Sequence, residues 1–343
     1  MLAEQEKIHL AGMLPEEICS KFEISPSFRG IQIFKWISQG VNSFEEMLNL
    51  PKDLRIKLNN KSLIKSSKIS QVLRDTDGTI KLQITLFDNR CIEAVLLTDK
   101  SQRKTACVSC QAGCGMNCAF CQTGKLGFGR NLTASEIVEQ FLFLEEIAGN
   151  LDNIVFMGMG EPMLNLNEIR KAVEILTHPE GKALSTRRIT LSTCGIIKGI
   201  YDLADNGPQL RLAVSLTTAN PELREKLMPV TKTNPLSQLK EAILYYTKKT
   251  GKRCTLEAAL MAGTNDTTDS ALEMANFAKG LDVHINLIPW NSIPNIPFST
   301  PTASECKKFV SILEKEGINV TLRTHRGRKI GGACGQLGKI TLE

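Results

Sequence analysis

The sequence predicts an α/β protein whose main body is a parallel sheet, either open or curled toward a barrel. The first observation is that short apolar runs alternate with amphipathic helical patterns about six times after residue 100. The second is that residues 1–75 are helical in pattern, which sets a small region apart from this body. The third is a strand–turn–strand pattern between the two, turning at Asp77 and Gly78.

Composition fits a globular protein of one large domain and one small one. The chain has 343 residues, 42% of them apolar and 23% charged, and a formal net charge of +6. This mildly basic balance is compatible with nucleic acid as a partner. The start of the chain carries acidic residues, and no apolar run reaches the length of a membrane span. We therefore expect a cytoplasmic protein without a membrane segment, whose 11 cysteines form no structural disulfides.

The N-terminal region, residues 1–75, is expected to be a helical accessory domain. Phe28, Ile31, Phe34 and Ile37 recur at helical spacing and predict a helix over 26–40. Between residues 52 and 68 stand six basic side chains against one acid. A solvated face is the commoner explanation of such a run, and an RNA-phosphate surface is the functional one. The basic residues are Lys52, Arg55, Lys57, Lys61, Lys65 and Lys68.

The remaining elements follow in order. A hairpin over 68–87 and a strand over 90–97 predict linking β-strands, assigned to residues 76–99, before a core over 100–343. Function in strand–helix folds gathers at the carboxyl ends of the strands, so residues after each apolar run are candidates. Strands are expected over 106–110, 153–160, 188–195, 211–218, 254–261 and 284–291, and helices over 135–149, 166–176, 196–205, 236–251 and 270–281. A last helix over 303–317 leads into 318–325.

The stretch "CGMNCAFC" is the strongest chemical signal. It spaces Cys114, Cys118 and Cys121 as C-x3-C-x2-C, close enough to converge on one metal centre. Structural zinc and most iron–sulfur clusters take four protein ligands, so three cysteines leave one corner of a metal centre open to a substrate. Zinc with Cys107 or Cys110 as fourth ligand is the structural alternative.

Polar residues follow four of the predicted strands. Gly160 and Glu161 end the apolar run "VFMGMGEP", where glycine allows close approach of a ligand and the carboxylate can hold an ammonium. Ser192 ends the next strand, the Ser215–Thr217 run the one after, and Asn291 follows "INLIPW". Each alone is more typical of a turn or a helix cap, but four in register with one cysteine cluster favour a binding site.

The cysteine spacing, with Phe120 before the last cysteine, resembles the radical S-adenosylmethionine (SAM) superfamily. Motifs along nearly the whole chain resemble one branch of it, the bacterial dual-specificity 23S rRNA and tRNA adenine-C2 methyltransferases. These include "FRGIQIFKWI", "SFEEMLNLPKDLR", "IEAV", "CVSC", "TGKLGFGRNLT", "MGMGEPMLN", "RRITLSTCGI", "KLMPV", "INLIPWN" and "ACGQL". The resemblance implies a partial (β/α)6 radical-SAM barrel with one 4Fe-4S cluster. It also implies two SAM molecules per turnover: one methylates a cysteine, and the other yields a radical that takes hydrogen from that methyl group.

The resemblance also implies roles for individual residues. Cys114, Cys118 and Cys121 match the cluster ligands, Cys334 matches the methyl-carrying cysteine, and Cys107 matches the cysteine that pairs with it transiently. Glu93 matches the proton acceptor. The matches to SAM contacts are Gly160, Glu161, Ser192, Ser215, Leu216, Thr217 and Asn291. Implied partners are 23S rRNA, tRNA and an electron donor such as a flavodoxin or ferredoxin, with a monomer as the working unit.

Several positions depart from the family pattern. Thr217 stands where the family usually has histidine, and Cys110 stands where it usually has serine, which makes Cys110 a possible competitor of Cys107. Before Cys334 the family tends to be acidic, whereas "KIGGAC" places Lys329, Gly331 and Gly332 there. This segment is therefore expected to be more flexible and more basic than in relatives.

Three other functions compete with this interpretation. The related adenine-C8 methyltransferase of 23S rRNA, which confers antibiotic resistance, shares the cluster and both cysteines, but Pro162, "LIPWN" and "RGRKI" favour the C2 branch. A non-catalytic zinc or iron–sulfur RNA-binding module is the alternative from another class. A radical-SAM methylthiotransferase normally needs a second cluster, and three further cysteines at cluster spacing are absent from the sequence.

Overall fold

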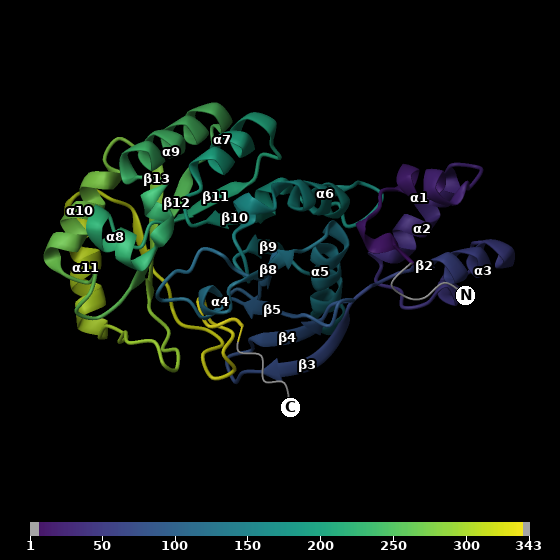
Figure 1. Cartoon of the computed structure of the whole chain (residues 1–343), viewed down its shortest axis with the longest axis horizontal. Coiled ribbons are helices and arrows are strands. Elements are labelled where there is room, and N and C mark those ends of the chain that lie inside the picture. The colour runs from purple at the N-terminus through teal and green to yellow at the C-terminus, as the bar shows by residue number, and fades with distance from the viewer. Residues whose placement is uncertain (1–6, 339–343) are drawn as a thin grey trace.

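A computed structural model of the chain describes residues 7–338 (Figure 1). Its N-terminal lobe contains the helices α1 (Pro15–Phe22), α2 (Phe28–Ser38) and α3 (Lys52–Lys61). Two short strands, β1 (Ile8–His9) and β2 (Ser62–Leu63), pair in parallel at its base. Figure 1 shows these three helices at one end of the molecule, beyond α5 and α6. Three helices of the region expected to be helical thus lie beside the main body, whereas its last residues, Lys68–Arg74, form a strand of the main sheet.

The helix expected over 26–40 is present as α2, but its buried face differs from the predicted one. Ile33, Phe34 and Ile37 are buried, whereas Phe28 is 48% exposed. The Phe34 ring lies edge-on to His178, with ring centroids 4.9 Å apart, and so packs the lobe against the main body. Aromatic residues at helical spacing do not all face the core, because a helix end can project beyond it.

A ten-stranded sheet forms the main body, in the order β14-β13-β12-β11-β10-β9-β6-β5-β4-β3. Seven strands run parallel from β6 to β14, which confirms the predicted strand–helix body and its partial barrel. They are β6 (Lys104–Cys107), β9 (Asn153–Phe156), β10 (Ile189–Thr193), β11 (Arg211–Ser215), β12 (Cys254–Leu260), β13 (Val283–Pro289) and β14 (Val320–Leu322). The antiparallel extension consists of β3 (Lys68–Arg74), β4 (Ile80–Thr85) and β5 (Cys91–Thr98), and β5 pairs antiparallel with β6.

The predicted helices cover the outside of this sheet (Figure 1). They are α5 (Ala134–Ala148), α6 (Leu166–Thr177), α7 (Ile197–Asn206), α9 (Leu236–Thr250), α10 (Thr268–Ala278) and α11 (Ala303–Lys315), with a shorter α8 (Pro221–Leu227). Smaller elements are β7 (Gln111–Gly113), β8 (Phe128–Asn131) and α4 (Gln122–Lys125), and 3-10 turns at Leu10–Gly12, Phe44–Glu46, Pro162–Leu164, Thr186–Arg188 and Pro229–Lys232. In the part that the structure describes, every helix is too short or too polar to span a membrane.

The β3–β4 hairpin belongs to the same sheet as the core, and its turn holds a distant segment of the chain. Gly78 has a φ of +85°, as the predicted turn at Asp77–Gly78 requires. The Asp77 carboxylate accepts a hydrogen bond from Gly327 N at 2.8 Å, and Asp75 accepts one from Lys329 N at 3.1 Å. The hairpin turn therefore fixes the backbone that leads into Cys334.

Candidate active site

One cavity of about 200 Å³ gathers most of the predicted site residues. It lies at the carboxyl ends of β9 to β13, where a parallel sheet is expected to place its site. Three chain segments close it: the cysteine loop after β7, the strand ends, and residues 331–338, which we call the Cys334 segment. The predicted residues that line it are Cys114, Cys118, Cys121, Gly160, Glu161, Ser192, Ser215, Asn291 and Cys334.

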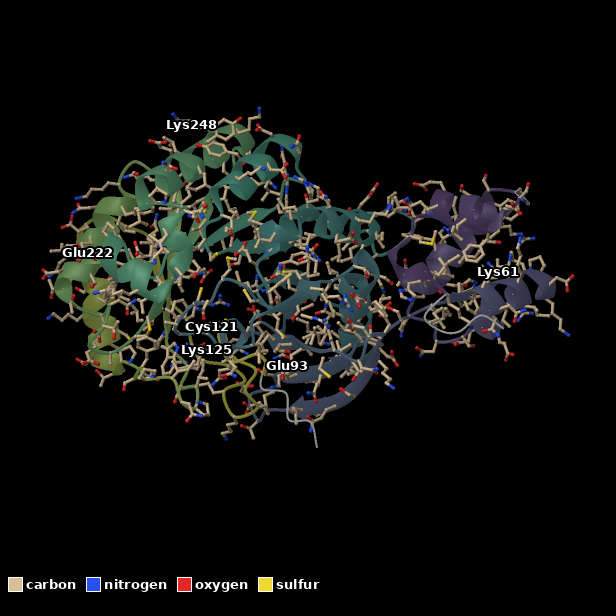
Figure 2. All side chains as sticks on the ribbon, viewed as in Figure 1. Lys61, Glu93, Cys121, Lys125, Glu222 and Lys248 are labelled. Carbon is tan, nitrogen blue, oxygen red and sulfur yellow. The ribbon has the colours of Figure 1, made fainter. Side chains whose placement is uncertain are left out.

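The three cysteines of the predicted cluster are partly buried on one side of this cavity. Their loop is held by Cys114 N, which donates to Gly127 O at 2.7 Å, and by Ala119 N, which donates to Leu227 O at 2.9 Å. Burial raises the pKa of Cys114 to about 11 and that of Cys118 further. Within residues 7–338 no group of three His, Cys, Asp or Glu side chains is tight enough for a single metal ion. Figure 2 shows Cys121 in the middle of the molecule, far from Lys61 on the N-terminal lobe.

Glu161 is buried beside the cysteines, and its carboxylate joins two strand ends. One oxygen accepts from Met163 N at 3.0 Å and the other from Cys194 N at 2.8 Å. Burial raises the pKa of Glu161, and these hydrogen bonds oppose that rise. The preceding Gly160 has a φ of +104°, and a Cβ there would lie 2.6 Å from the Gln111 side chain. Both facts explain why glycine is needed at this point of the cavity.

Residues 215–217, at the end of β11 and just after it, comprise one residue that lines the cavity and two that do not. Ser215 lines the cavity, whereas the Leu216 and Thr217 side chains are fully buried elsewhere. Leu216 N and Thr217 N both donate to Glu257 O, at 2.9 and 3.2 Å. Thr217 has a φ of +62°, and its hydroxyl finds no hydrogen-bond partner among residues 7–338. Of these three predicted contacts, only Ser215 presents its side chain to the cavity.

Cys334 faces a second, smaller cavity as well. This cavity of about 60 Å³ is lined by both Cys107 and Cys334, together with Arg323, Asn291 and His325. Asn291 Nδ2 donates to Cys334 O at 3.1 Å, and Asn291 Oδ1 lies 2.8 Å from His325 Nδ1. The structure therefore brings together the two cysteines that the family resemblance pairs.

Cys107 and Cys110 occupy different surroundings. Burial raises the pKa of the Cys107 thiol to about 12, and nearby Cys334 adds to the rise. Cys110 is 2% exposed and lies away from the small cavity, where its carbonyl accepts from Asn165 Nδ2 at 2.8 Å. All 11 cysteines are free thiols in this structure. Of the two candidates, Cys107 is the one that shares a cavity with Cys334.

Glu93 lies on β5 and faces a third cavity, of about 430 Å³. Its side chain is 2% exposed and pairs with Lys81 Nζ at 2.8 Å. Its other oxygen accepts from Gly338 N at 2.6 Å. Arg328, Lys329 and Gly331 also line this cavity, so Glu93 and the cysteine cluster lie on opposite sides of the Cys334 segment.

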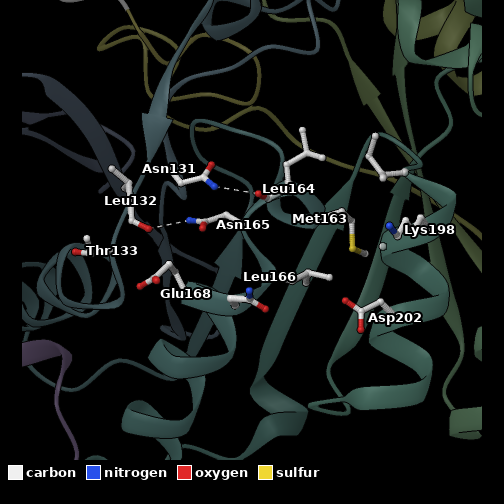
Figure 3. A pocket seen from close by; sticks show the side chains of 13 residues that line it. Asn131, Leu132, Thr133, Met163, Leu164, Asn165, Leu166, Glu168, Lys198 and Asp202 are labelled. Atoms are coloured by element: carbon white, nitrogen blue, oxygen red, sulfur yellow. Dashed lines mark hydrogen bonds between the residues drawn. The ribbon is translucent and has the colours of Figure 1, made fainter.

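A separate cavity of about 600 Å³ opens between the starts of α6 and α7 (Figure 3). Its lining mixes polar and apolar residues, with Asn131 Nδ2 donating to Leu164 O at 3.0 Å and Asn165 Nδ2 to Leu132 O at 2.9 Å. None of the predicted site residues lines it. Its size therefore does not make it the active site.

The sequence analysis missed Arg224, a fully buried arginine that stabilises the ends of β10 and β11. Its guanidinium donates to the carbonyl oxygens of Cys194, Ser215 and Leu216 at 2.8 to 3.2 Å. It also donates to the Thr231 hydroxyl at 2.8 Å. The motif "KLMPV", at residues 226–230, was the sequence feature closest to Arg224. It indicates a conformation for this part of the chain but does not reveal that the arginine is buried.

We expect Arg224→Met to lower both stability and SAM affinity. Buried carbonyls would lose charge-assisted hydrogen bonds, at a cost of about 3 kcal/mol in the free energy of unfolding. SAM affinity is expected to fall roughly ten-fold, because Ser215 lies next to the freed carbonyls. Calorimetry measures both quantities, and Lys226→Met, an exposed change on the same helix, is the control. Equal unfolding temperatures for the two variants would contradict this role of Arg224.

Glu257 was also missed. It is 7% exposed and lines the main cavity, and its Oε2 finds no hydrogen-bond donor among residues 7–338. Asn286 Nδ2 holds the other oxygen at 3.0 Å, and Arg323 Nη1 lies 3.9 Å from Oε2. Burial raises the pKa of this carboxyl and Arg323 opposes the rise. In the sequence it is one polar residue within the apolar run "CTLEAALM", and nothing there distinguishes it.

Comparison with known proteins decides the family. Residues 20–64 match the ribosomal RNA large subunit methyltransferase N-terminal domain, and residues 108–278 match the radical SAM superfamily. The probable dual-specificity RNA methyltransferase RlmN of Treponema denticola is 60% identical over 338 residues, which cover 98% of this chain and 97% of that protein. The chain belongs to the RlmN family.

Other RlmN relatives and a solved structure agree. The probable dual-specificity RNA methyltransferase RlmN of Treponema pallidum (strain Nichols) is 55% identical over 330 residues, covering 96% of this chain and 97% of that protein. A crystal structure of a radical SAM methyltransferase from Sphaerobacter thermophilus has a TM-score of 0.93 and 38% identity. It covers 96% of this chain and 99% of that chain. The expected fold class and family are both confirmed.

As an RlmN-family radical SAM enzyme, the protein uses a 4Fe-4S cluster and SAM. The described residues fit these groups. Three cysteines line one cavity, and Glu161, Ser192 and Ser215 line the same space at neighbouring strand ends. Glu257 Oε2 accepts no hydrogen bond among residues 7–338 and lies 3.9 Å from Arg323 Nη1, so it provides a further acceptor for a hydroxyl or cationic group in that cavity.

Proposed function

We propose that this protein methylates carbon 2 of a specific adenine in 23S rRNA and in tRNA, through a methylated Cys334. The observation that carries the proposal is the position of Cys334, which lines both the cysteine-cluster cavity and the cavity of Cys107. At that junction the Cys334 sulfur can receive a methyl group from the side of the cluster cavity. From the other side, the Cys107 thiol can free it from the methylated base. The names of the RlmN relatives, dual-specificity RNA methyltransferases, support this substrate class.

In this proposal Cys114, Cys118 and Cys121 hold the cluster. Glu161, Ser192, Ser215 and Asn291 bind SAM by their side chains, and Gly160, Leu216 and Thr217 shape the backbone around it. When bound, cluster and SAM supply the methyl group and the one-electron chemistry needed at the electron-poor carbon 2. Asn291 contributes a second function, since its amide holds the Cys334 carbonyl. The cavity thus fixes the sulfur relative to the cofactor.

The 430 Å³ cavity is the proposed entry site of the target nucleotide. Its volume lies within the usual range for small-ligand sites, and the exposed Arg328 and Lys329 at its edge suit RNA phosphates. An adenine there would meet Glu93, the proposed acceptor of the carbon 2 proton, whose carboxylate pairs with the Lys81 ammonium. The base must leave the RNA stack to reach this depth.

Cys107 is the proposed resolving residue. Attack of the Cys107 thiolate on the Cys334 sulfur forms a transient disulfide and breaks the bond between that sulfur and the methylene carbon. The carbon keeps the electron pair and takes up a proton, which completes the methyl group on the released base. A cellular dithiol then reduces the disulfide and restores both thiols. The proposed electron donor is a flavodoxin or ferredoxin, and the proposed working unit is a cytoplasmic monomer.

The proposed RNA surface includes part of the basic run over 52–68, which extends from α3 of the N-terminal lobe to the start of β3. Lys52, Lys61 and Lys68 are exposed. In contrast, Lys57 Nζ donates to Phe22 O at 2.5 Å, and Lys65 Nζ pairs with Glu146 at 3.2 Å. Some lysines of this stretch therefore make structural contacts, and others are exposed and can bind phosphate.

Changing the three exposed lysines to glutamine is expected to weaken RNA binding and reduce its salt dependence. Each lost phosphate contact lowers the slope of log affinity against log salt by roughly 0.7 to 0.9, so the triple variant loses roughly 2 to 3. Titration with tRNA at several salt concentrations measures this. A charge-matched control changes the exposed Lys248, Lys307 and Lys308 on α9 and α11. Equal slopes for both triple variants would exclude the lobe surface.

The proposed reaction is tested by anaerobic reconstitution of the cluster and incubation with SAM, a reductant and either 23S rRNA or tRNA. Mass spectrometry of the digested nucleosides is expected to show 2-methyladenosine. The absence of this nucleoside with both RNAs would contradict the proposal, and 8-methyladenosine would assign the chain to the C8 reaction instead.

A further inference from the structure

Lys81 is a buried lysine that has no part in the proposed reaction as described above. It lies on β4 with a side chain that is 4% exposed, and its Nζ is 2.8 Å from Glu93 Oε1. The same ammonium donates to Gly331 O at 3.3 Å. A buried lysine is costly unless paired, so both contacts are needed to keep its charge in this position.

The Lys81–Glu93 ion pair touches the Cys334 segment at both ends. Lys81 holds Gly331 at its start, and Glu93 Oε2 holds Gly338 N at its end, at 2.6 Å. Cys334 lies between these two points. One buried ion pair therefore determines how far apart the ends of the segment lie.

Gly331 permits this contact. Its φ is +62°, a conformation that favours glycine, and a Cβ there would lie 3.4 Å from Lys81 Nζ. The segment that the sequence predicts to be loose thus gives its carbonyl to a buried cation. At Gly331 the segment is held through its backbone carbonyl and needs no side chain for this contact.

The middle of the segment is held from the opposite side. Gln122 N donates to Gly335 O at 2.8 Å, and the Thr123 hydroxyl donates to Leu337 O at 2.7 Å. These contacts come from the cysteine loop, whereas Lys81 and Glu93 come from the sheet. The ion pair is thus independent of the cofactor side of the site.

We propose that Lys81 is a positioning residue whose ion pair with Glu93 holds the Cys334 segment in place and loosens it when Glu93 loses its charge. The second half rests on the proposed function, in which Glu93 accepts the proton of the target base. Neutral Glu93 no longer attracts the Lys81 ammonium and accepts a weaker hydrogen bond from Gly338 N, so the contacts at both ends of the segment weaken together. The segment is then free to move as Cys334 turns from the base to Cys107.

Because Cys334 is exposed in this structure, the test measures release of the backbone rather than reactivity of the thiol. The measured quantity is the rate of hydrogen–deuterium exchange in the peptide that carries residues 331–338 of the reconstituted, SAM-free enzyme, by mass spectrometry. Lys81→Met is expected to raise this rate about ten-fold, the effect of losing one charge-assisted hydrogen bond. Glu93→Gln, which mimics the neutral carboxyl, is expected to do the same. Lys182→Met, which removes another partly buried ion pair, with Glu145, is the matched control and should leave the rate unchanged.

Misfolding is separated from release of the segment in two ways. The double variant Lys81→Met/Glu93→Gln leaves no unpaired buried charge and is expected to stay folded with the same rise in rate. The peptide that carries the fully buried Cys254 reports global opening and should exchange at the wild-type rate. A wild-type exchange rate for residues 331–338 in the folded double variant would overturn the proposal. Because the assay uses no RNA, its outcome is independent of whether the enzyme forms 2-methyladenosine.

Discussion

Replacing Cys334 with alanine is expected to abolish RNA methylation, lowering product by at least a factor of roughly a thousand. Cys334 is the cysteine that lines both the cluster cavity and the cavity of Cys107. Without its sulfur the methyl group has no acceptor next to the cofactor. Product is measured as 2-methyladenosine after anaerobic turnover with tRNA.

The control for this variant is Cys19→Ala, which removes a thiol from α1 in the N-terminal lobe. It should methylate RNA at close to the wild-type rate. Cys334→Ala should still bind SAM, since Glu161, Ser192 and Ser215 are unchanged. Continued formation of 2-methyladenosine by Cys334→Ala would show that the methyl group reaches RNA without this cysteine.

Replacing Cys107 with alanine is expected to trap the protein on its RNA. The small cavity shared with Cys334 is the place from which a second thiol can reach the Cys334 sulfur. Alanine leaves the methyl transfer to Cys334 intact but removes the thiol that releases the base. A covalent protein–RNA species is therefore expected to accumulate to about the enzyme concentration, visible on denaturing gels as a nuclease-sensitive band.

The matched control is Cys110→Ala, which removes a buried thiol three residues away that lies outside this cavity. It should turn over without an accumulated adduct. If Cys110→Ala traps RNA and Cys107→Ala does not, the resolving role moves to Cys110. Because the pKa of Cys107 is raised to about 12, its release step should also be faster at higher pH, where more thiolate is present.

The strand–helix body was predictable because its elements carry simple periodicities. Apolar runs such as "NIVFMGMG" mark buried parallel strands, and the residues that follow them fall at one edge of the sheet. That rule predicts one shared site for Glu161, Ser192, Ser215 and Asn291, and the structure has all four lining one cavity. The cysteine spacing was equally local, since three thiols within eight residues need only one loop to converge.

Other features depend on contacts between distant parts of the chain. Lys81 and Gly331 are 250 residues apart, and no periodicity connects them. Arg224 and Glu257 look like surface charges in sequence, and they are buried because strand ends and a helix close over them. The side chains of Leu216 and Thr217 are fully buried, so the cofactor contacts that the family resemblance implies for them stay a prediction about their backbone. The sequence predicts which helix or strand carries a residue, but it does not always predict which way the side chain of that residue points.

The order in which the cavity is completed during synthesis follows from the Cys334 segment. Every other residue that lines the cluster cavity precedes Asn291 or is Asn291 itself, whereas Cys334, Gly335 and Leu337 come later. A ribosome-bound chain thus contains all the cluster cysteines before their last enclosing segment is made. In such a nascent chain the cavity lacks the part of its lining that the Cys334 segment supplies. Folding of that segment completes the lining and, in the same event, places Cys334 in the cavity of the three cysteines.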